Sequence, residues 1–234
     1  MEGFDFKVAL FDLDGVVLDT ESQYSEFYGA IGREFHPETP DFAQRIKGMT
    51  LEQIYGAWFD GQPDVQAEIT RRLNVFEANM KYNYIEGFPT FIQELRAAGI
   101  KTAIVTASND EKMQSVYRAH PELLSLFDRI LTAKDYAASK PAPDCYLRAA
   151  ELFGADPSAC VVFEDSINGL KAGRAAGAFV VGLTTTNPEE KVAPLADITM
   201  ADFTGANHRL HRFFNYEFDE FGEFLARRSQ LDEL

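Results

Sequence analysis

The sequence is poor in cysteine and contains no long apolar run. Cys145 and Cys160 are the only cysteines among its 234 residues, and neither has the spacing of a metal site. We therefore expect two buried thiols in a reducing compartment. No stretch reaches the roughly 18 consecutive apolar residues of a transmembrane helix, and no basic segment precedes an apolar stretch near the N-terminus. These absences argue against secretion and membrane insertion and predict a cytoplasmic protein.

Basic residues are also scarce. Lysine and arginine total 22 against 37 aspartates and glutamates, which gives a net charge of −15. This balance disfavours nucleic-acid binding, because phosphate backbones attract lysine and arginine. It also means that an anionic substrate needs positive charge supplied locally. The sequence indicates no protein partner, and its 46% of hydrophobic residues suffice for a sizeable core.

Two carboxylates one residue apart are the most informative feature that is present. Asp12 and Asp14 lie in the segment 11–15, which follows the apolar run 8–10 and ends at Gly15. A short apolar run predicts a buried strand, and residues i and i+2 of an extended chain point to the same side. Neighbouring acids repel each other, so the pair indicates that a cation or a reaction requires both. An acidic turn that ends the strand is the alternative.

Four further β-rich runs alternate with amphipathic segments of helical length. The runs cover residues 101–106, 129–133, 160–164 and 178–183. Helices are predicted over 89–98 and 143–153, because each begins with proline and is followed by glycine. The alternation predicts an α/β fold with a parallel sheet.

Chemically active residues stand at the ends of these predicted strands. Asp12 follows the first run, Thr106 ends the second, and Glu164 and Asp165 stand at the end of the run 160–164. Parallel sheets bind ligands at the carboxyl ends of their strands. We therefore expect these residues to converge on one pocket.

Residues 20–87 contain no convincing strand and predict a helical insertion. Thr20 and Thr50 each begin a capping-box pattern, with glutamine three residues later, and a third helix is predicted over 63–84. The predicted domains are a core of residues 1–19 and 88–234 and the insertion 20–87, which is either a hinged lid or a rigid subdomain. The aromatic residues expected to pack inside the insertion are Phe27, Tyr28, Tyr55, Trp58, Phe59 and Phe76.

Four segments resemble the motifs of the haloacid dehalogenase superfamily. They are Asp12-Leu-Asp14-Gly15 with Asp19-Thr20, Val105-Thr106-Ala-Ser108, Lys140-Pro-Ala-Pro143, and Phe163-Glu164-Asp165-Ser-Ile-Asn-Gly169. The resemblance covers nearly the whole chain and points to the β-phosphoglucomutase-like and sugar phosphatase branch. It implies a Rossmann-like parallel sheet core with an inserted all-helical cap, here residues 20–87.

This resemblance implies roles in phosphoryl transfer for individual residues. Asp12 is the expected nucleophile, which forms an aspartyl-phosphate. Asp14 is the expected general acid and base. Thr106 and Lys140 are expected to stabilise the phosphoryl oxygens. The substrate contacts that it implies are Thr106, Ala107, Ser108, Lys140 and, from the cap, Lys47.

The resemblance also implies a Mg²⁺ ion. Hard oxygen ligands in small number suit this cation, and its attraction offsets the repulsion between a phosphate and these acids. The implied ligands are the Asp12 carboxylate, the Asp14 backbone carbonyl and Asp165. Glu164 either binds the ion directly or contacts the residues that bind it. The partner of the site is then a small phosphorylated metabolite.

Two departures from the mutase pattern favour a phosphatase. The mutases carry a histidine four residues after the motif threonine and an arginine four residues after the cap lysine, whereas this chain has Tyr24 and Leu51 there. Water is then the expected acceptor, and the family branch suggests a sugar phosphate as substrate. The alternatives are a β-phosphoglucomutase-type mutase, a phosphonate hydrolase that uses Lys47, and a non-catalytic phosphate-binding module.

Two further features are less specific. The cap residues that are candidates to face the substrate are Lys47, Tyr24 and Trp58, and the sequence does not show which of them do. The segment 213–224 is aromatic and acidic, and predicts an amphipathic helix packed on the core, with a partner-binding surface as the alternative.

Overall fold

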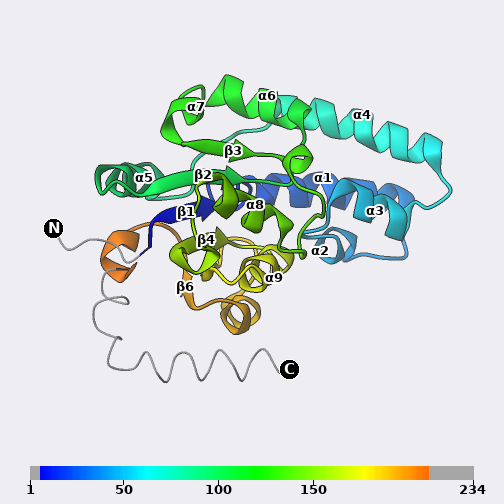
Figure 1. The fold of residues 1–234 in the computed structure, drawn as a ribbon. Helices are drawn as coiled ribbons and strands as arrows, with labels where there is room; N and C mark the ends of the chain where they lie inside the picture. Colours follow the sequence, from blue (N-terminus) through cyan, green and yellow to red (C-terminus); the bar gives the residue numbers. More distant parts are fainter. Residues whose placement is uncertain (1–5, 211–234) are drawn as a thin grey trace.

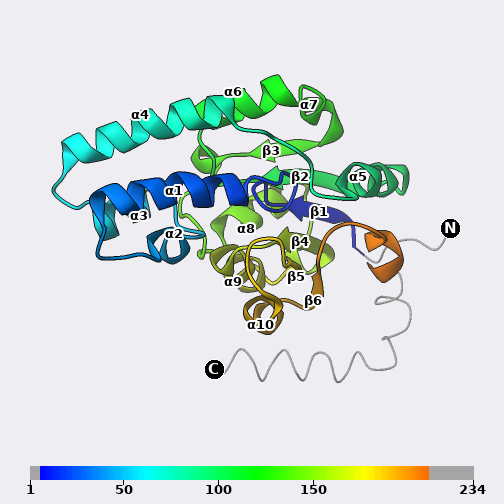
Figure 2. The ribbon, with the colours of Figure 1, turned by 180° about the vertical axis from the view of Figure 1, so that it is seen from behind.

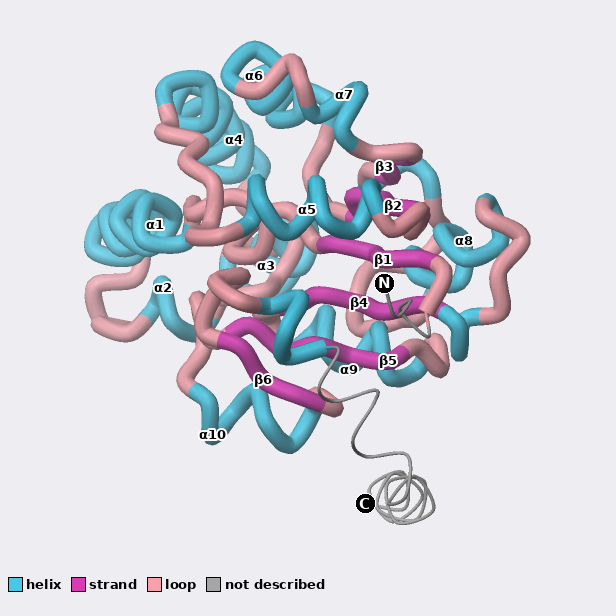
Figure 3. Tube along the Cα trace, turned by 90° about the vertical axis from the view of Figure 1, so that its left-hand side faces the viewer, coloured by secondary structure: helices cyan, strands magenta, loops and turns pink. Residues whose placement is uncertain are grey.

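A six-stranded parallel β-sheet forms the centre of the molecule (Figure 1). The computed structural model describes residues 6–210 of the chain. The strands are β1 (Val8–Phe11), β2 (Lys101–Val105), β3 (Arg129–Leu131), β4 (Cys160–Glu164), β5 (Phe179–Leu183) and β6 (Ile198–Met200). Figure 3 shows them in the spatial order β3-β2-β1-β4-β5-β6, and each adjacent pair is parallel. The predicted α/β class is confirmed, although the sequence did not indicate β6.

Helices cover both faces of this sheet. They are α5 (Phe88–Ala97), α6 (Asp110–Ala119), α7 (Leu123–Leu126), α8 (Asp144–Leu152), α9 (Ile167–Ala175) and α10 (Glu189–Val192), with the 3-10 turns η1 (Ala133–Asp135), η2 (Pro157–Ala159) and η3 (Ala193–Leu195). Helices α5 and α6 bury side chains in one hydrophobic cluster, and α8 and α9 do so in another. The predicted helices over 89–98 and 143–153 correspond to α5 and α8.

The two clusters arise from the twofold periodicity of the strands. Ala9 and Phe11 of β1 belong to the first cluster, whereas Val8 and Leu10 belong to the second. Successive side chains of a strand point to opposite faces, and helices cover both faces of a parallel sheet. All four residues are buried for this reason, which explains why the run preceding Asp12 is continuously apolar.

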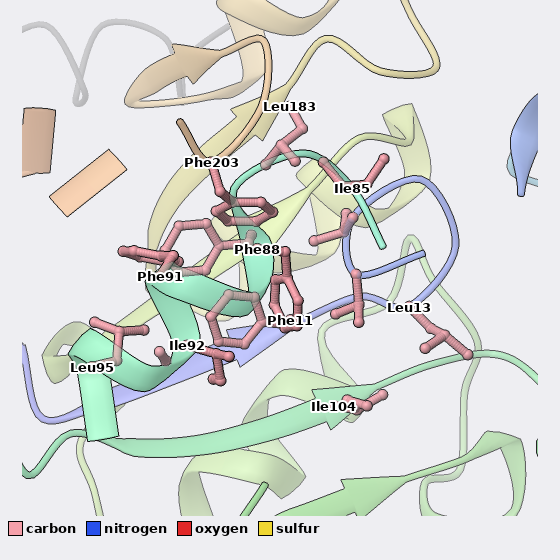
Figure 4. Close-up of a cluster of buried hydrophobic side chains, with 14 of the residues drawn as sticks. Phe11, Leu13, Ile85, Phe88, Phe91, Ile92, Leu95, Ile104, Leu183 and Phe203 are labelled. Atoms are coloured by element: carbon pink, nitrogen blue, oxygen red, sulfur yellow. The ribbon is translucent and has the colours of Figure 1, made fainter. Parts of the chain in front are cut away.

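Phenylalanine side chains dominate the first cluster (Figure 4). Phe11 stacks on Phe163 with ring centroids 4.5 Å apart, and Phe91 and Phe203 lie with centroids 5.2 Å apart. Each fully buried side chain of this size contributes about 1.5–3 kcal/mol through removal of its apolar surface from water. The stacked pair joins β1 to β4 immediately before the acidic residues of both strands, so packing here fixes the backbone that carries the site.

A helical insertion follows β1, as predicted. It contains α1 (Glu21–Phe35), α2 (Phe42–Arg45), α3 (Leu51–Trp58) and α4 (Pro63–Asn79). Figures 1 and 2 show these helices together at one end of the sheet, beyond the carboxyl end of β1. They enclose a third hydrophobic cluster that includes Phe42, Phe59 and Ile69. Phe76 instead packs against the first cluster and stacks on Phe27.

The two connections between insertion and sheet pair with each other. The backbone N–H of Asp19 donates to the carbonyl of Asn83 (2.8 Å), and that of Ile85 donates to the carbonyl of Val17 (3.0 Å). The helix predicted over 63–84 therefore ends early, at Asn79. Residues 80–85 are drawn out of the helix because Tyr82 and Ile85 are buried in the first cluster.

One of the two predicted capping boxes is wrong. Thr50 caps α3 as predicted, since its hydroxyl accepts from the Gln53 N–H and the Gln53 side chain accepts from the Thr50 N–H. Thr20 makes no such bond to α1. Its buried hydroxyl instead donates to Asp14 Oδ1 at 2.6 Å. A hydrogen bond to a carboxylate is stronger than one between neutral groups, so the Thr20 side chain is oriented toward Asp14 and not toward the N–H groups of α1.

The structure of residues 6–210 also bears on the predicted thiols and on membrane insertion. Cys145 and Cys160 are buried free thiols, as expected. No helix in this range is both long and apolar enough to cross a bilayer. The amphipathic helix predicted over 213–224 lies outside the described residues. The division of the chain at residues 20 and 87 stays a prediction.

Candidate active site

The predicted residues meet in one cavity between the sheet and the helical insertion. The cavity has a volume of about 500 Å³. Asp12, Asp14, Thr106, Lys140 and Asp165 line it from the core. Side chains of α1, α3 and α4 line it from the insertion. All five residues stand at or beyond the carboxyl ends of the strands, where parallel sheets commonly bind ligands.

Asp12 and Lys140 form the central ion pair. Lys140 Nζ donates to Asp12 Oδ1 at 2.6 Å, to Glu164 Oε1 at 2.6 Å and to the carbonyl of Val105 at 3.1 Å. Only 6% of Lys140 is exposed. Although burial acts against its charge, the carboxylates of Asp12 and Glu164 raise the pKa of Lys140 well above its ordinary value. The lysine therefore stays protonated and supplies the local positive charge that an anionic substrate requires.

Glu164 is completely buried and fully engaged by donors. Its Oε1 accepts from Lys140 and from the Tyr146 hydroxyl (2.7 Å). Its Oε2 accepts from the N–H groups of Asp165 (3.2 Å) and Ser166 (3.3 Å) and from Ser166 Oγ (3.1 Å). Glu164 thereby holds Lys140 in place. Tyr146, which the sequence did not identify, supports this arrangement from α8.

Three carboxylates could hold a divalent cation. Oxygens of Asp12, Glu164 and Asp165 lie within 4.8 Å of one another. Burial raises the pKa of Asp165 well above its usual range, and the charges of Glu164 and Asp12 add to this effect. Burial likewise raises the pKa of Asp12 to about 7, against the opposing charge of Lys140. A buried set of hard oxygen ligands fits Mg²⁺, whose charge favours the ionised carboxylates.

The turn that follows β2 lines the cavity with Thr106, Ala107 and Ser108. The N–H of Ser108 donates to Thr106 Oγ1 at 3.1 Å, and Thr106 Oγ1 donates to Ser108 Oγ at 2.9 Å. This turn exposes polar groups to the cavity beside Asp14, whose Oδ2 lies 3.4 Å from Ser108 Oγ. Both residues line the cavity, and in this structure each hydroxyl donates its hydrogen to a neighbouring side chain.

Lys112 is a residue of the site that the sequence did not predict. It lies in the first turn of α6, lines the cavity, and forms an ion pair with Asp14 Oδ2. The position of Lys112 in the sequence could have identified it. A helix that starts just after the end of a strand places its first turn at the same edge of the sheet. The predicted motif ended at Ser108 and did not extend to this turn.

The insertion contributes both predicted and unpredicted residues. Lys47 lines the cavity, and its Nζ donates to the carbonyl of Thr186 at 3.2 Å. Tyr24 also lines it, and its hydroxyl donates to Glu77 Oε1 at 2.8 Å. Trp58 does not line it and instead packs edge-on against Phe42 with ring centroids 5.1 Å apart. Of the three candidates, Lys47 and Tyr24 line the cavity and Trp58 does not.

Gly15 permits the close approach of two parts of the site, and its replacement is our first prediction. Its φ of 74° is unfavourable for residues with a Cβ, and a Cβ there would collide with the Asp165 carboxylate. We expect Gly15→Ala to lower catalytic turnover about 10²-fold, because small displacements in a site have effects of this size. Steady-state kinetics and thermal unfolding measure the change.

Gly61 provides the matched control. It has a similar φ of 70°, but a Cβ added at this position would have no neighbouring atom within 4 Å. Gly61→Ala introduces the backbone strain alone, about 1–3 kcal/mol, and should leave turnover unchanged. Equal activity in the two variants would contradict the role of the Gly15–Asp165 approach.

Several known proteins are similar to this chain in sequence. The family model described as haloacid dehalogenase-like hydrolase matches residues 6–177. A β-phosphoglucomutase from Mycobacterium bovis is 30% identical over 84% of this chain and 89% of its own. Validoxylamine A 7'-phosphate phosphatase from Streptomyces hygroscopicus subsp. limoneus is 27% identical, over 85% of this chain and 95% of its own.

A solved structure agrees with the fold. A family IA, variant 3 haloacid dehalogenase hydrolase from Entamoeba histolytica superposes with a TM-score of 0.73 at 21% identity, over 84% of this chain and 93% of its own. The match of the family model spans the strand ends that carry Asp12, Thr106, Lys140 and Asp165. This protein therefore belongs to the haloacid dehalogenase-like hydrolase family.

Proposed function

We propose that this hydrolase is a Mg²⁺-dependent phosphatase that cleaves a small phosphomonoester through an aspartyl-phosphate. The observation that carries the proposal is the convergence of Asp12, Asp14, Thr106 and Lys140 on one cavity beside a cluster of buried carboxylates. A nucleophile, an acid–base group and anion-stabilising donors within one pocket are the parts that phosphoryl transfer requires.

The chain's own groups account for both half-reactions. Asp12 attacks phosphorus, an oxygen–phosphorus bond forms, and the bond to the leaving alkoxide breaks while Asp14 protonates that oxygen. Water then attacks the same phosphorus, Asp14 accepts its proton, and inorganic phosphate leaves as the Asp12 carboxylate is regenerated. The structure shows both oxygens of Asp14 accepting hydrogen bonds, so Asp14 must take up a proton before the first step. It leaves that step deprotonated and ready to act as a base.

The donors at the cavity floor stabilise charge on the phosphoryl oxygens. Lys140 is fixed by Asp12 and Glu164, and Thr106 by its contact with Ser108. Lys140 keeps its charge beside the phosphoryl group without reorganisation, whereas the Thr106 hydroxyl would turn from Ser108 to donate to a phosphoryl oxygen. The backbone amides of Ala107 and Ser108 complete the proposed phosphate cradle.

Asp12, Asp165 and the backbone carbonyl of Asp14 would hold the Mg²⁺ ion. The ion supplies charge neutralisation that allows a phosphate to approach the carboxylates. Because both oxygens of Glu164 already accept hydrogen bonds, we propose that Glu164 acts by holding Lys140 rather than as a direct ligand.

The residues at the two mutase marker positions favour hydrolysis. Tyr24 occupies the hinge position and is engaged with Glu77 through its hydroxyl, so it offers no imidazole for proton transfer. Leu51 occupies the other position and offers no charge for a second phosphate. The phosphatase from Streptomyces hygroscopicus is a relative consistent with this choice. Because a β-phosphoglucomutase from Mycobacterium bovis is also a relative, phosphosugar transfer is the second candidate function.

The cavity supports a small polar substrate. Its wall from the insertion, which we propose is a cap over residues 20–87, presents Glu21, Tyr24, Lys47 and Glu77. Carboxylates, a phenol and an ammonium group are suitable partners for several hydroxyl groups. We therefore propose a sugar or polyol phosphate as the substrate class.

The decisive experiment measures phosphate release from a panel of sugar phosphates, polyol phosphates and phosphoglycolate, with Mg²⁺ or with EDTA. We expect turnover with Mg²⁺ and at least about a 10²-fold loss with the chelator, because the ion neutralises the reacting charges. Interconversion of β-glucose 1-phosphate and glucose 6-phosphate without phosphate release would establish the mutase instead. If the protein catalyses neither reaction with any ester, the enzymatic proposal is rejected.

A further inference from the structure

A buried lysine lies beside the proposed acid–base group and has no part in the mechanism above. Lys112 of α6 is only 5% exposed, although it lines the cavity. Lysine is rarely buried unless it is paired, because removal of its charge from water is costly. Its position therefore requires a specific partner, and that partner is Asp14.

Both carboxylate oxygens of Asp14 are held by donors from different segments. Thr20 Oγ1 donates to Oδ1 at 2.6 Å. Lys112 Nζ donates to Oδ2, and Ser108 Oγ lies 3.4 Å from the same atom. Lys112 is the only charged group among these three donors. Because charge-assisted bonds are stronger than neutral ones, Lys112 contributes most to the orientation of this carboxylate.

The insertion in turn holds Lys112. Its Nζ lies 4.8 Å from the centroid of the Tyr24 ring, within the range of a cation–π contact. The Tyr24 hydroxyl donates to Oε1 of Glu77, which is 6% exposed and comes from α4. Burial raises the pKa of Tyr24 well above its ordinary value, so the phenol keeps its proton and the ring stays neutral. A chain of contacts thus runs from Glu77 through Tyr24 and Lys112 to Asp14.

We propose that Lys112 is a positioning residue that orients Asp14 for acid–base catalysis. The inference rests on the proposed phosphatase function and deepens it, since it assigns Lys112 to the same site. The core supplies the lysine, and Tyr24 and Glu77 of the insertion fix where its charge lies. Two other roles are distinguishable from this one: direct binding of substrate by Lys112, and a purely structural ion pair.

A double-mutant cycle between Lys112 and Asp14 tests the proposal. We expect Lys112→Met to lower kcat about 10–100-fold, a part of the 10²–10⁴-fold that acid–base catalysis contributes, with KM within about twofold of the wild-type value. Lys112→Arg should restore part of kcat because it keeps the charge. In the Asp14→Asn background, Lys112→Met should cause no further loss, because a residue that acts through Asp14 has nothing left to orient.

Lys134 offers a matched control beside the same helix. Its Nζ pairs with both carboxylate oxygens of Asp110 in α6 at 2.7 Å, but its side chain is 64% exposed. Lys134→Met removes a lysine–aspartate pair at α6 without touching the cavity, and should change neither kcat nor KM. Inhibition by inorganic phosphate and the thermal unfolding midpoint, measured for every variant, report whether the site and fold remain intact.

Each outcome decides between the roles. A raised KM with unchanged kcat, or losses that multiply in the double variant, would show that Lys112 binds substrate and would overturn the positioning role. Wild-type kcat in Lys112→Met would reduce the pair to a structural one. A structural role would also follow if Lys112→Met lost kcat together with phosphate inhibition and thermal stability, and if Lys112→Arg failed to restore kcat. If the wild-type protein cleaves no phosphomonoester, the proposed function fails and this inference fails with it.

Discussion

Replacement of Asp12 by asparagine is expected to lower kcat about 10⁴-fold or more, the scale of loss when a nucleophile is removed. An amide oxygen is a poor nucleophile, so no covalent phosphoryl intermediate forms. The change also removes the negative charge that pairs with Lys140. It replaces one of the three carboxylates whose oxygens lie within 4.8 Å of one another. Steady-state phosphate release gives the loss, and acid quenching with ³²P-labelled substrate tests for the aspartyl-phosphate.

Asp128 supplies the matched control for this variant. It pairs with Lys101 at the amino end of the sheet, where Lys101 begins β2. Asp128→Asn removes one carboxylate from a lysine–aspartate pair, as Asp12→Asn does, and should leave kcat unchanged. Labelled protein in Asp12→Asn, or turnover within tenfold of the wild type, would show that another residue carries the phosphoryl group.

Replacement of Lys140 by methionine is expected to reduce both stability and activity. The variant leaves the carboxylates of Asp12 and Glu164 buried without their shared cation. Removal of one partner from a buried ion pair costs about 3–5 kcal/mol of unfolding free energy. The loss of a preorganised donor to the phosphoryl group should lower kcat about 10²–10³-fold. Chemical denaturation and steady-state kinetics measure the two effects separately.

Two further variants separate the stability effect from the catalytic one. Lys140→Met combined with Glu164→Gln removes a charge from each side of the pair, so it should recover part of the unfolding free energy without restoring kcat. Lys101→Met removes a lysine that is 60% exposed and paired with Asp128, and should cost at most about 1 kcal/mol. A stable and fully active Lys140→Met variant would contradict the central role of this lysine.

The parts of the fold that follow from local pattern were predictable. Short β-rich runs marked β1 to β5, and the strands near the centre of the sheet are mostly apolar because helices cover both of its faces. Thr50 was recognised as a helix cap since its partner, Gln53, lies in the same turn. Strand ends then located Asp12, Thr106 and Asp165, because parallel strands place their carboxyl ends at one edge.

Predictions failed where a distant partner competed with a local one. Thr20 had the pattern of a cap, but the carboxylate of Asp14 accepts its hydroxyl hydrogen instead. The helical pattern after Pro63 continued beyond Asn79, but burial of Tyr82 in the first cluster ended the helix. The strand β6 gave no clear signal because its three residues include Thr199 and stand between Asp197 and Asp202.

The sequence by itself determined the order of strands and helices and the residues that stand at the strand ends, because periodicity and caps act between near neighbours. Only the tertiary structure decided that Lys112 pairs with Asp14, that Lys140 lies between Asp12 and Glu164, and that Tyr24 rather than Trp58 reaches the cavity. Buried charges take whichever opposite charge the packing brings within reach, and that choice depends on residues far apart in the chain.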